Sequence, residues 1–551
     1  MKQLINKLLV LNKGEIFGRL AFAINKKTKK YDRFLSKNLK NVPTIELLNI
    51  FSKEERLTYN QTPFVLNYCG KDIDVKNIDI CSKSDKWYLL KESCFAGDIR
   101  EFWEPARLQF INLLISNYLV TKNHSIVEEI DNYLSWWFEN NPIDCGFNHI
   151  SNLEIAIRFL VLYRVYFYFG KQIKTDLNSI LYQYGLHLFF DLHRTNLCVP
   201  NNHSLGEATS LLLAARIFRN RKWEEYAKKT IGKRINLIND FGESIEESSG
   251  YQLFVTQMMI VILSITDEFD HLILPKIVKS KISLKSISDK YGNIGKYGDC
   301  DDGLFFNFDS FERNNIKCIE SNFFISSNKI ETFESNYKNT EYIYEKTSKY
   351  LKVVEKDKWK VAMIGGYEIN HSHIQCLSIL AWYDGVQTIF SPGSYRYNGT
   401  EEKTRLSLSS QKYSNAPITQ KVERNNFITK FRHKRIIKKV SIVMENDKKK
   451  NISGKVVYKG QTVERNIAIE NNQIVVFDEA NNTLLPYYIC VGDTSNTIRI
   501  QKNKTNCPIY KRDYSPKYGV LQQADYYAVD SNSKTSMIFI GYEKSSLFNK
   551  V

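Results

Sequence analysis

No cysteine pair of the form Cys-x-x-Cys occurs in this chain of 551 residues, although it contains ten cysteines. This absence excludes zinc-ribbon and thioredoxin-type sites, which need two thiols at that spacing. Scattered cysteines in a chain of this length predict reduced, mostly buried thiols.

Long apolar runs are also missing. The basic N-terminal stretch has only a four-residue apolar run, at residues 8–11, and no small-residue cleavage site follows it. Such a run is too short for the core of a signal peptide, and no stretch of the chain approaches the length of a membrane span. The sequence therefore predicts a soluble cytoplasmic protein without a transmembrane segment, with the periplasm as the alternative location.

The composition is that of a folded protein, with 43% hydrophobic and 13% aromatic residues. The length favours two or three domains. Lys and Arg outnumber Asp and Glu by 77 to 60, which gives a formal net charge of +17. This excess suits nucleic acid, an anionic membrane face or an acidic polysaccharide, but a genome rich in Lys, Asn and Ile codons would produce the same bias. We expect no nucleic-acid partner, because the basic residues are spread along the chain and no nucleic-acid-binding module is present.

The first half of the chain has the apolar spacing of helices joined by short loops. Several of these segments are apolar nearly all round, as is typical of helices buried between other helices. We expect helices at residues 107–120, 124–140, 152–169, 179–194, 205–218, 223–240 and 252–269.

From about Tyr342 the pattern changes to short β-branched runs broken by Gly, Asn and Asp. Runs such as 467–469 and 474–476, separated by an Asn-Asn turn, predict antiparallel strands packed as a sandwich. The predicted architecture is a helical domain followed by a β-sandwich. The predicted boundaries are a helical or extended lead-in at 1–94, the helical domain at 95–340 and the sandwich at 341–551.

Three hydrogen-bonding side chains, those of Asn201, Asn202 and His203, stand just ahead of an apolar run. If the helix begins near Ser204, these residues lie in the loop and cap, where side chains project beyond the helix end. Simple capping explains one asparagine. The second asparagine and the histidine are surplus to a cap and are candidates for a binding site.

Three more clusters follow along the chain. Tyr251 opens an apolar helix after an acidic turn, where a tyrosine most often serves as a packing aromatic. Aspartates among glycines at 297–306 would bind a cation or form a hydrogen-bonded turn, and the lack of an EF-hand pattern favours the turn. His371 and His373 are two residues apart, so on a strand they face the same side, as a metal-binding or acid–base pair does.

In this order the four clusters resemble the heparinase II/III-like family of polysaccharide lyases. In that family a helical (α/α) toroid carries an Asn-Asn-His loop and a Tyr after a Glu-Ser segment, and an antiparallel β-sandwich carries a His-x-His strand followed by Asp-Gly and Asp-Pro-Gly turns. The resemblance spans roughly residues 95–420 and implies an incomplete helical barrel, the (α/α) toroid, followed by the sandwich. The matching positions are Asn201-Asn202-His203, Glu247 to Tyr251, Gly298 to Gly303, His371-Ser372-His373, Asp384-Gly385 and Pro392 to Tyr395, with Trp103, Glu104, Arg107, Asn148, Ser151, Glu154 and Arg158 upstream.

The resemblance implies β-elimination on an acidic, uronic-acid-containing, glycosaminoglycan-like polysaccharide, with loss of the proton on C5 and of the oxygen on C4. The neighbouring carboxylate must be neutralised or hydrogen-bonded so that enolate charge can develop there, and Asn202 suits that task because an amide donates without titrating. Tyr251 would act as acid or, if cations favour its phenolate, as base, with His203 and His371 as base or carboxylate neutralisers. These four are the predicted catalytic residues, and the predicted substrate-binding residues are Asn201, Trp103, Glu104, Arg107, Asn148, Glu247 and Tyr395.

Members of the family commonly hold a metal, often zinc, on the second His of the His-x-His strand, the Asp of the Asp-Pro-Gly turn and a later His. Here His373 is present, but Ser391 and Ser414 stand at the other two positions and Gln375 replaces the Asp of the strand. A zinc site needs three or four ligands. We therefore expect neither a metal nor another cofactor.

Two hypotheses of function remain. The favoured one is a polysaccharide lyase, and the alternative is a non-catalytic carbohydrate-binding or scaffold protein of a polysaccharide-assembly system, suggested by the lost metal positions. The N-terminal LNKGEIFGRL is similar to that of relatives encoded with machinery for surface polysaccharides, an analogy that favours a biosynthetic setting. The sequence predicts neither the polymer nor the oligomeric state.

Overall fold

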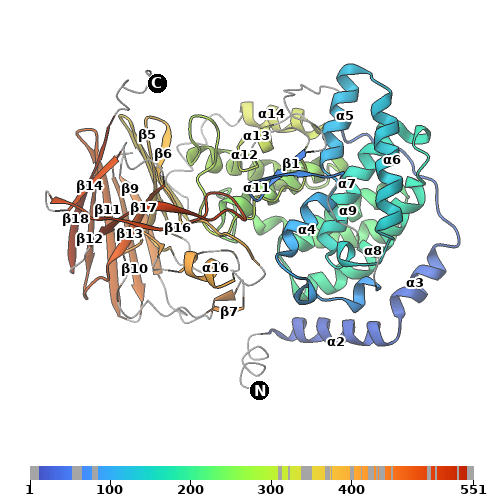
Figure 1. Cartoon of the computed structure of the whole chain (residues 1–551), viewed down its shortest axis with the longest axis horizontal. Coiled ribbons are helices and arrows are strands. Elements are labelled where there is room, and N and C mark those ends of the chain that lie inside the picture. Colours follow the sequence, from blue (N-terminus) through green and yellow to red (C-terminus); the bar gives the residue numbers. More distant parts are fainter. Residues whose placement is uncertain are drawn as a thin grey trace.

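The computed structural model places a helical half beside a β half, with the N-terminal helices along the outer edge of the helical half (Figure 1). None of the described helices has the length and hydropathy of a membrane-crossing segment. No described cysteine is in a disulfide, and most of them are buried. The structure describes residues 11–52, 65–76, 85–307, 313–320, 323–336, 350–365, 371, 373, 375–397, 402–410, 413–417, 419, 427–429, 432–433, 441–447, 451–458, 460–492, 498–502, 505–529 and 533–542.

The helical half is built around α9, which packs against α7, α8, α10 and α11. Helices α7, α9 and α11 are apolar on nearly every face, because a helix that is enclosed by other helices has no side exposed to solvent. The helices are α2 (Lys13–Lys27), α3 (Lys30–Asn38), α4 (Ile99–Ala106), α5 (Phe110–Thr121), α6 (Ser125–Asn140), α7 (Asn152–Phe169), α8 (Leu177–Cys198), α9 (Asn202–Ile217), α10 (Arg221–Arg234), α11 (Ser249–Ile265), α12 (Asp270–Ser286), α13 (Lys317–Glu320) and α14 (Ser326–Asn336), with a hairpin of β1 (Val65–Tyr68) and β2 (Lys71–Asp74) before α4.

The β half consists of antiparallel sheets. A seven-stranded sheet has the order β15-β14-β18-β12-β11-β10-β9, and a four-stranded sheet β3-β4-β5-β6 and a three-stranded sheet β13-β17-β16 share one apolar core with it. The strands are β3 (Leu351–Lys356), β4 (Trp359–Ile364), β5 (Ser378–Tyr383), β6 (Val386–Ile389), β9 (Ser441–Asp447), β10 (Asn451–Tyr458), β11 (Gln461–Glu470), β12 (Gln473–Ala480), β13 (Tyr487–Gly492), β14 (Ile498–Lys502), β15 (Thr505–Asn506), β16 (Ile509–Tyr514), β17 (Gln522–Val529) and β18 (Lys534–Gly541), with a separate pair β7 (Phe427–Thr429) and β8 (Arg432–His433).

The hairpin of β11 and β12 shows how the sequence specifies this sheet. Buried and more exposed residues alternate along both strands, as one face of a sheet against a core requires. Asn471 and Asn472 join the strands with φ values of 51° and 54°. Two left-handed residues form the tight turn that matches strand twist, and asparagine tolerates that conformation. The predicted helical region followed by antiparallel strands is confirmed.

Strand β5 connects the two halves. All six of its residues are buried, because Ile379, Ala381 and Tyr383 face the sandwich core while Leu380 and Trp382 face the core of the helical half. A strand covered on both sides reads as a continuous apolar run rather than an alternating one. The candidate site lies at this junction, where the N-terminal ends of α9 and α11 meet loops of the β half.

Candidate active site

Asn201 caps α9 and leaves the next two residues for other contacts. Its side-chain oxygen accepts a hydrogen bond from the backbone N–H of His203 at 3.1 Å, and α9 begins at Asn202. The helix therefore starts two residues before the expected Ser204. The side-chain amide of Asn202 donates to both carboxylate oxygens of Glu246, at 3.2 and 3.1 Å.

Glu246 belongs to the site, whereas the sequence match pointed to its neighbour Glu247. Glu246 is buried, and this burial raises the pKa of its carboxyl group above the usual value. Glu247 has a φ of 55° and turns the chain toward Ser248. Adjacent side chains in a turn point in different directions, so the sequence motif alone did not show which of the two glutamates contacts Asn202.

Tyr251 and His371 stack face to face, with ring centroids 3.8 Å apart and an interplanar angle of 23°. The cap of α11 fixes Tyr251, because its backbone N–H donates to the hydroxyl of Ser248 at 3.2 Å. The phenolic oxygen of Tyr251 lies 3.4 Å from a carboxylate oxygen of Asp301 and 3.3 Å from the phenol of Tyr397. The stack joins the start of a helix to the loop that precedes β5.

The phenol of Tyr251 is held in its protonated form. Burial, and next the carboxylate of Asp301, raise the pKa of Tyr251 well above its usual value of 10.0. The guanidinium of Arg100 acts in the opposite direction with a smaller effect. The condition for a phenolate, a surplus of cations around the ring, is not met here.

Asp299 joins both histidines of the His-x-His segment to a buried arginine. Its carboxylate oxygens lie 3.4 Å from Nδ1 of His371, 3.1 Å from Nε2 of His373 and 2.6 Å from Nη2 of Arg405. Burial opposes the charge of Asp299, but Arg405 and the histidines outweigh it and hold the pKa of this carboxyl group well below its usual range. Arg405 comes from α16 (Glu402–Leu408), and no motif in the sequence pointed to it.

His203 is uncharged at neutral pH, because burial lowers its pKa to about 4. Glu154 and Asp301 raise this pKa by smaller amounts, while Arg100 and His371 lower it further. A neutral imidazole can accept a proton or a hydrogen bond. It does not supply the positive charge that was one of the two roles predicted for it.

A buried network of ion pairs lies next to the site. Nη1 of Arg107 lies 2.7 Å from Glu104, and Nε of Arg107 lies 2.7 Å from Glu154. Arg100 links this network to the site, with Nη2 2.7 Å from Asp301 and Nη1 3.4 Å from Glu154. Arg107 and Glu104, both predicted to bind substrate, are 1% and 3% exposed and contact protein rather than an open surface.

The other predicted substrate-binding residues also hold protein segments in place. The indole N–H of Trp103 donates to a backbone carbonyl at 2.9 Å, and the amide of Asn148 donates to another buried asparagine at 2.6 Å. Tyr395 is buried with a φ of 54°, and its backbone N–H donates to the hydroxyl of Ser515 at 3.0 Å. Together with the cap that Asn201 provides, these contacts hold the protein around the site, and a role for these residues in substrate binding stays a prediction.

The residues at the family's metal positions do not fit a zinc ion. Nε2 of His373 is 3.1 Å from Asp299, and Ser391 and Ser414 offer hydroxyls where thiolate, imidazole or carboxylate ligands would be needed. Gln375, two residues after His373 in the chain, is also buried. Within the described ranges, no group of three or more His, Cys, Asp or Glu residues is placed to hold a metal. The lack of a cofactor stays a prediction.

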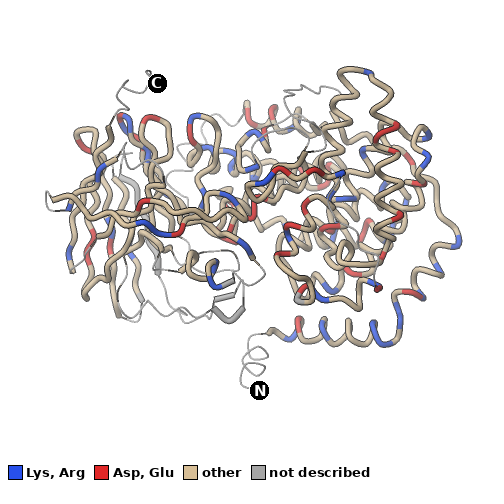
Figure 2. Tube along the Cα trace, viewed as in Figure 1, with Lys and Arg blue, Asp and Glu red and all other residues tan. Residues whose placement is uncertain are grey.

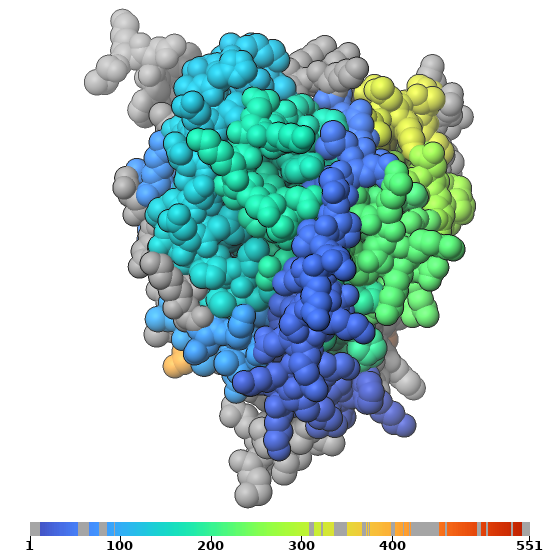
Figure 3. Space-filling model, turned by 90° about the vertical axis from the view of Figure 1, so that its right-hand side faces the viewer, coloured from blue at the N-terminus to red at the C-terminus, as the bar shows by residue number. Residues whose placement is uncertain are grey.

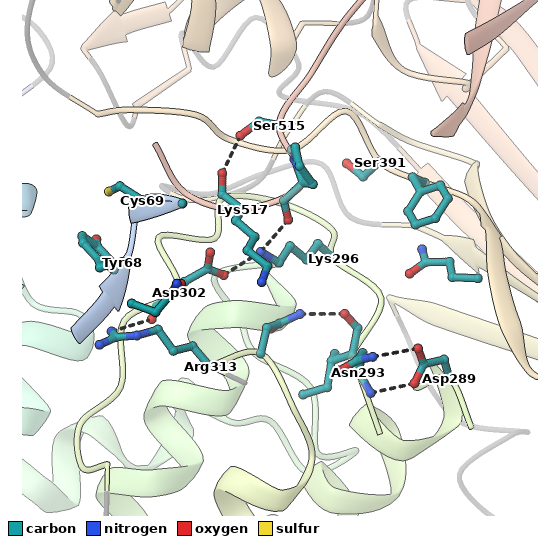
Figure 4. A pocket seen from close by; sticks show the side chains of 18 of the residues that line it. Tyr68, Cys69, Asp289, Asn293, Lys296, Asp302, Arg313, Ser391, Ser515 and Lys517 are labelled. Atoms are coloured by element: carbon teal, nitrogen blue, oxygen red, sulfur yellow. Dashed lines mark hydrogen bonds and ion pairs between the residues drawn. The ribbon is translucent and has the colours of Figure 1, made fainter. Parts of the chain in front are cut away.

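A cavity of about 600 Å³ lies next to the site. Asp302 lines it, and the preceding residue, Asp301, contacts Tyr251. Figure 4 shows its basic side, where Nζ of Lys296 lies 2.6 Å from Asp302 and the guanidinium of Arg313 is close to the backbone of the same residue. Lys517, the second acid Asp289, several side-chain amides and a number of apolar side chains also line the cavity. None of the four predicted catalytic residues lines this cavity, so it adjoins their cluster without including it.

The four predicted catalytic residues are nevertheless brought together. Asn202 bonds to Glu246, His371 lies close enough to Glu246 and His203 to influence the pKa of both, and His371 stacks on Tyr251. One cluster therefore contains an amide, a neutral imidazole, a second imidazole and a protonated phenol, contributed by both halves of the molecule.

Comparison with known proteins gave matches in structure only. No family model matches the sequence, and no curated protein does. A heparinase III gene product matches with a TM-score of 0.53 and 13% identity over 83% of this chain and 80% of the other. A second heparinase III structure matches with a TM-score of 0.55 and 12% identity over 81% and 78%. A heparan sulfate lyase HepC mutant from Pedobacter heparinus has a TM-score of 0.50 and 13% identity over 93% and 83%.

At 12–13% identity these matches show the fold. They agree with the order of elements described above, a helical region followed by antiparallel β-sheets. The chain has a heparinase-like lyase fold.

Proposed function

We propose that the protein is a polysaccharide lyase that cleaves an acidic, uronate-containing polymer by β-elimination. The observation that carries this proposal is the stack of Tyr251 on His371 beside the Asn202–Glu246 pair, in a fold shared with heparinase III. The reaction needs a group that stabilises the uronate carboxylate, a base for the C5 proton and an acid for the departing C4 oxygen. The cluster offers all three.

Asn202 and Glu246 are suited to receive the carboxylate. A carboxyl group whose pKa is raised by burial can stay protonated and donate a hydrogen bond, and the Asn202 amide donates at any pH. Two donors aimed at the uronate carboxylate would stabilise the negative charge that gathers there as the C5–H bond breaks. In the described structure the two groups bond to each other, so substrate would have to enter between them.

His371 is suited to remove the C5 proton, and Tyr251 is suited to protonate the C4 oxygen that leaves. Asp299 accepts from Nδ1 of His371 at 3.4 Å, which favours the tautomer with its basic nitrogen at Nε2. As that nitrogen takes the C5 proton, the C4–O bond breaks, a C4–C5 double bond forms and the phenol of Tyr251 protonates the oxygen that leaves. His203, neutral at pH 7, is a second candidate for the base.

The basic side of the adjoining cavity suits the rest of an acidic chain. Lys296, which is ion-paired with Asp302, Arg313, which is ion-paired with Glu104, and Lys517 lie around it together with side-chain amides. Cationic groups and amides bind carboxylates and sugar hydroxyls. The proposal therefore extends to a polymer with further acidic units beside the cleaved uronate. A biosynthetic role with surface polysaccharides is part of this proposal and rests on the N-terminal resemblance.

The test is incubation with a panel of uronate polymers, followed by ultraviolet absorbance. Elimination creates a C4–C5 double bond conjugated with the carboxylate, so at least one polymer should give a rising signal. If a folded protein binds a polymer and no polymer of the panel gives this signal, the lyase proposal is wrong. That outcome would support the alternative of a non-catalytic carbohydrate-binding or scaffold protein, which the burial of Asn202 and Tyr251 favours.

Glu246→Gln is expected to keep most of the rate and to change its pH dependence. Since the folded pKa of Glu246 is raised, the wild-type carboxyl group is protonated at lower pH, and a rate that depends on its proton falls as pH rises through that pKa. Glutamine donates at every pH, so this fall should disappear, and Glu246→Ala should lose about 10²-fold.

Glu247→Gln is the matched control for these variants, because it makes the same change one residue away from the Asn202 contact. The measurement is the pH profile of the elimination rate for all four proteins. A profile in which Glu247→Gln changes and Glu246→Gln does not would contradict the assignment of Glu246.

A further inference from the structure

Helix α2 presents an apolar stripe to the outside of the molecule. Phe17, Leu20 and Ile24 are 62%, 59% and 63% exposed, and Ile16 beside them is 37% exposed. Their spacing places them on one side of the helix. Figure 3 shows the dark-blue N-terminal segment as a ridge across this face of the molecule.

The opposite side of α2 holds the helix on the protein. A Cβ on Gly18 would lie 2.8 Å from Sγ of Cys198, so only glycine allows this close approach to α8. Asn12 and Glu15 form a reciprocal capping box with both bonds at 2.9 Å, and Glu15 is buried. The helix is therefore held on the protein by the close approach at Gly18 and by Phe22, whose ring centroid lies 5.8 Å from that of Trp87, and the exposed apolar side chains are not needed to attach it.

The charges around the stripe are positive. From residue 11 to residue 40 the sequence has nine Lys or Arg residues against two acids. Of the two acids, Glu15 is buried in the cap, and Asp32 accepts a hydrogen bond from Tyr88 at 2.5 Å. Lys13 and Lys27 stand at the two ends of the stripe, and Figure 2 shows Lys and Arg positions along α2 and α3. Apolar side chains flanked by Lys and Arg match the chemistry of an anionic lipid surface.

We infer that α2 binds an anionic membrane surface, lying in the plane of the interface with Phe17, Leu20 and Ile24 turned toward the lipid. A second copy of the chain fits less well, since a stable protein interface uses about 20–30 residues a side and the stripe offers four large apolar side chains. Among the described helices none crosses a membrane, so this contact is peripheral. It does not depend on the proposed lyase activity.

The experiment is sedimentation of the full chain with vesicles. We expect binding to vesicles of equimolar phosphatidylglycerol and phosphatidylcholine, weaker binding to phosphatidylcholine alone and a decrease at high salt. Phe17→Ser and Leu20→Ser are each expected to weaken partitioning by about tenfold or more, because each removes a large apolar side chain from the lipid contact. Lys27→Glu should weaken binding to the anionic vesicles only.

Leu272→Ser on α12 is the matched control, because Leu272 is 43% exposed and α12 packs against α11 and α14, whereas α2 packs against α8 and α3. It should bind vesicles like the wild type, as should Tyr251→Phe. Thermal melting should be unchanged for Phe17→Ser, since an exposed side chain is replaced. Equal sedimentation of the wild type and Phe17→Ser would overturn the inference. So would a dimer in light scattering that Phe17→Ser converts to a monomer without any vesicle binding.

Discussion

Tyr251→Phe is expected to lower the elimination rate by about 10²–10⁴-fold, the usual contribution of a positioned acid or base. The variant removes one hydroxyl and keeps the ring that stacks on His371 at 3.8 Å. The lost oxygen makes long contacts, 3.4 Å to Asp301 and 3.3 Å to Tyr397, so the free energy of unfolding should change by about 1 kcal/mol or less. The measurements are the ultraviolet assay and thermal melting of the same preparations.

Tyr163→Phe makes the same chemical change far from the site. The phenol of Tyr163 donates to the backbone carbonyl of Leu48 at 2.6 Å, so its loss should cost some stability and leave the rate unchanged. This control separates a chemical role from a general effect of removing a buried hydroxyl. A Tyr251→Phe variant with the full wild-type rate would exclude Tyr251 as the acid.

Asp299→Asn is expected to lower the free energy of unfolding by about 3–5 kcal/mol, the usual cost of removing one partner of a buried ion pair. The substitution leaves the guanidinium of Arg405 buried without its counter-charge, from which it is now 2.6 Å away. It also removes the carboxylate that fixes the ring of His371. Chemical denaturation should show the loss of stability, and the activity of the folded fraction should decrease as well.

The pH dependence of this difference follows from the pKa of Asp299, which is lowered from 3.8 in the folded state. A carboxyl group with a lowered folded pKa contributes its full stabilisation above the unfolded pKa and loses it as pH falls toward the folded pKa. The gap between the wild type and Asp299→Asn should therefore be constant near neutral pH and shrink below about pH 4. Asp478→Asn breaks a similar buried pair with Arg465 in the sandwich, at 2.7 Å, and should lower stability without changing the activity of the folded fraction. A gap that widens in acid would contradict the assignment of the charge to Asp299.

Much of the fold could be predicted because it depends on local pattern. The segment 152–169, apolar nearly all round, is α7 over the same residues, and the Asn-Asn turn joins β11 to β12 as expected. Strand β5 was harder to predict from the sequence, because it is buried on both faces and a short apolar run does not distinguish a strand from a helix.

The candidate site could be predicted only in part. Asn202, Tyr251 and His371 were found because short motifs around them resemble those of a known family. The motif named Glu247 and not Glu246, which bonds to Asn202. Arg405 was not found because it reaches Asp299 from 106 residues away in the chain. No local pattern records a contact of that kind.

The sequence by itself determined which segments form helices and which form strands, since caps, turns and apolar spacing act over a few residues. It also determined which residue types stand near the site. Only the tertiary structure decided how those residues are charged and which of them are covered. The phenol of Tyr251 stays protonated and Arg107 lies in a buried ion network, because desolvation and long-range charge depend on segments that are brought together only when the chain folds.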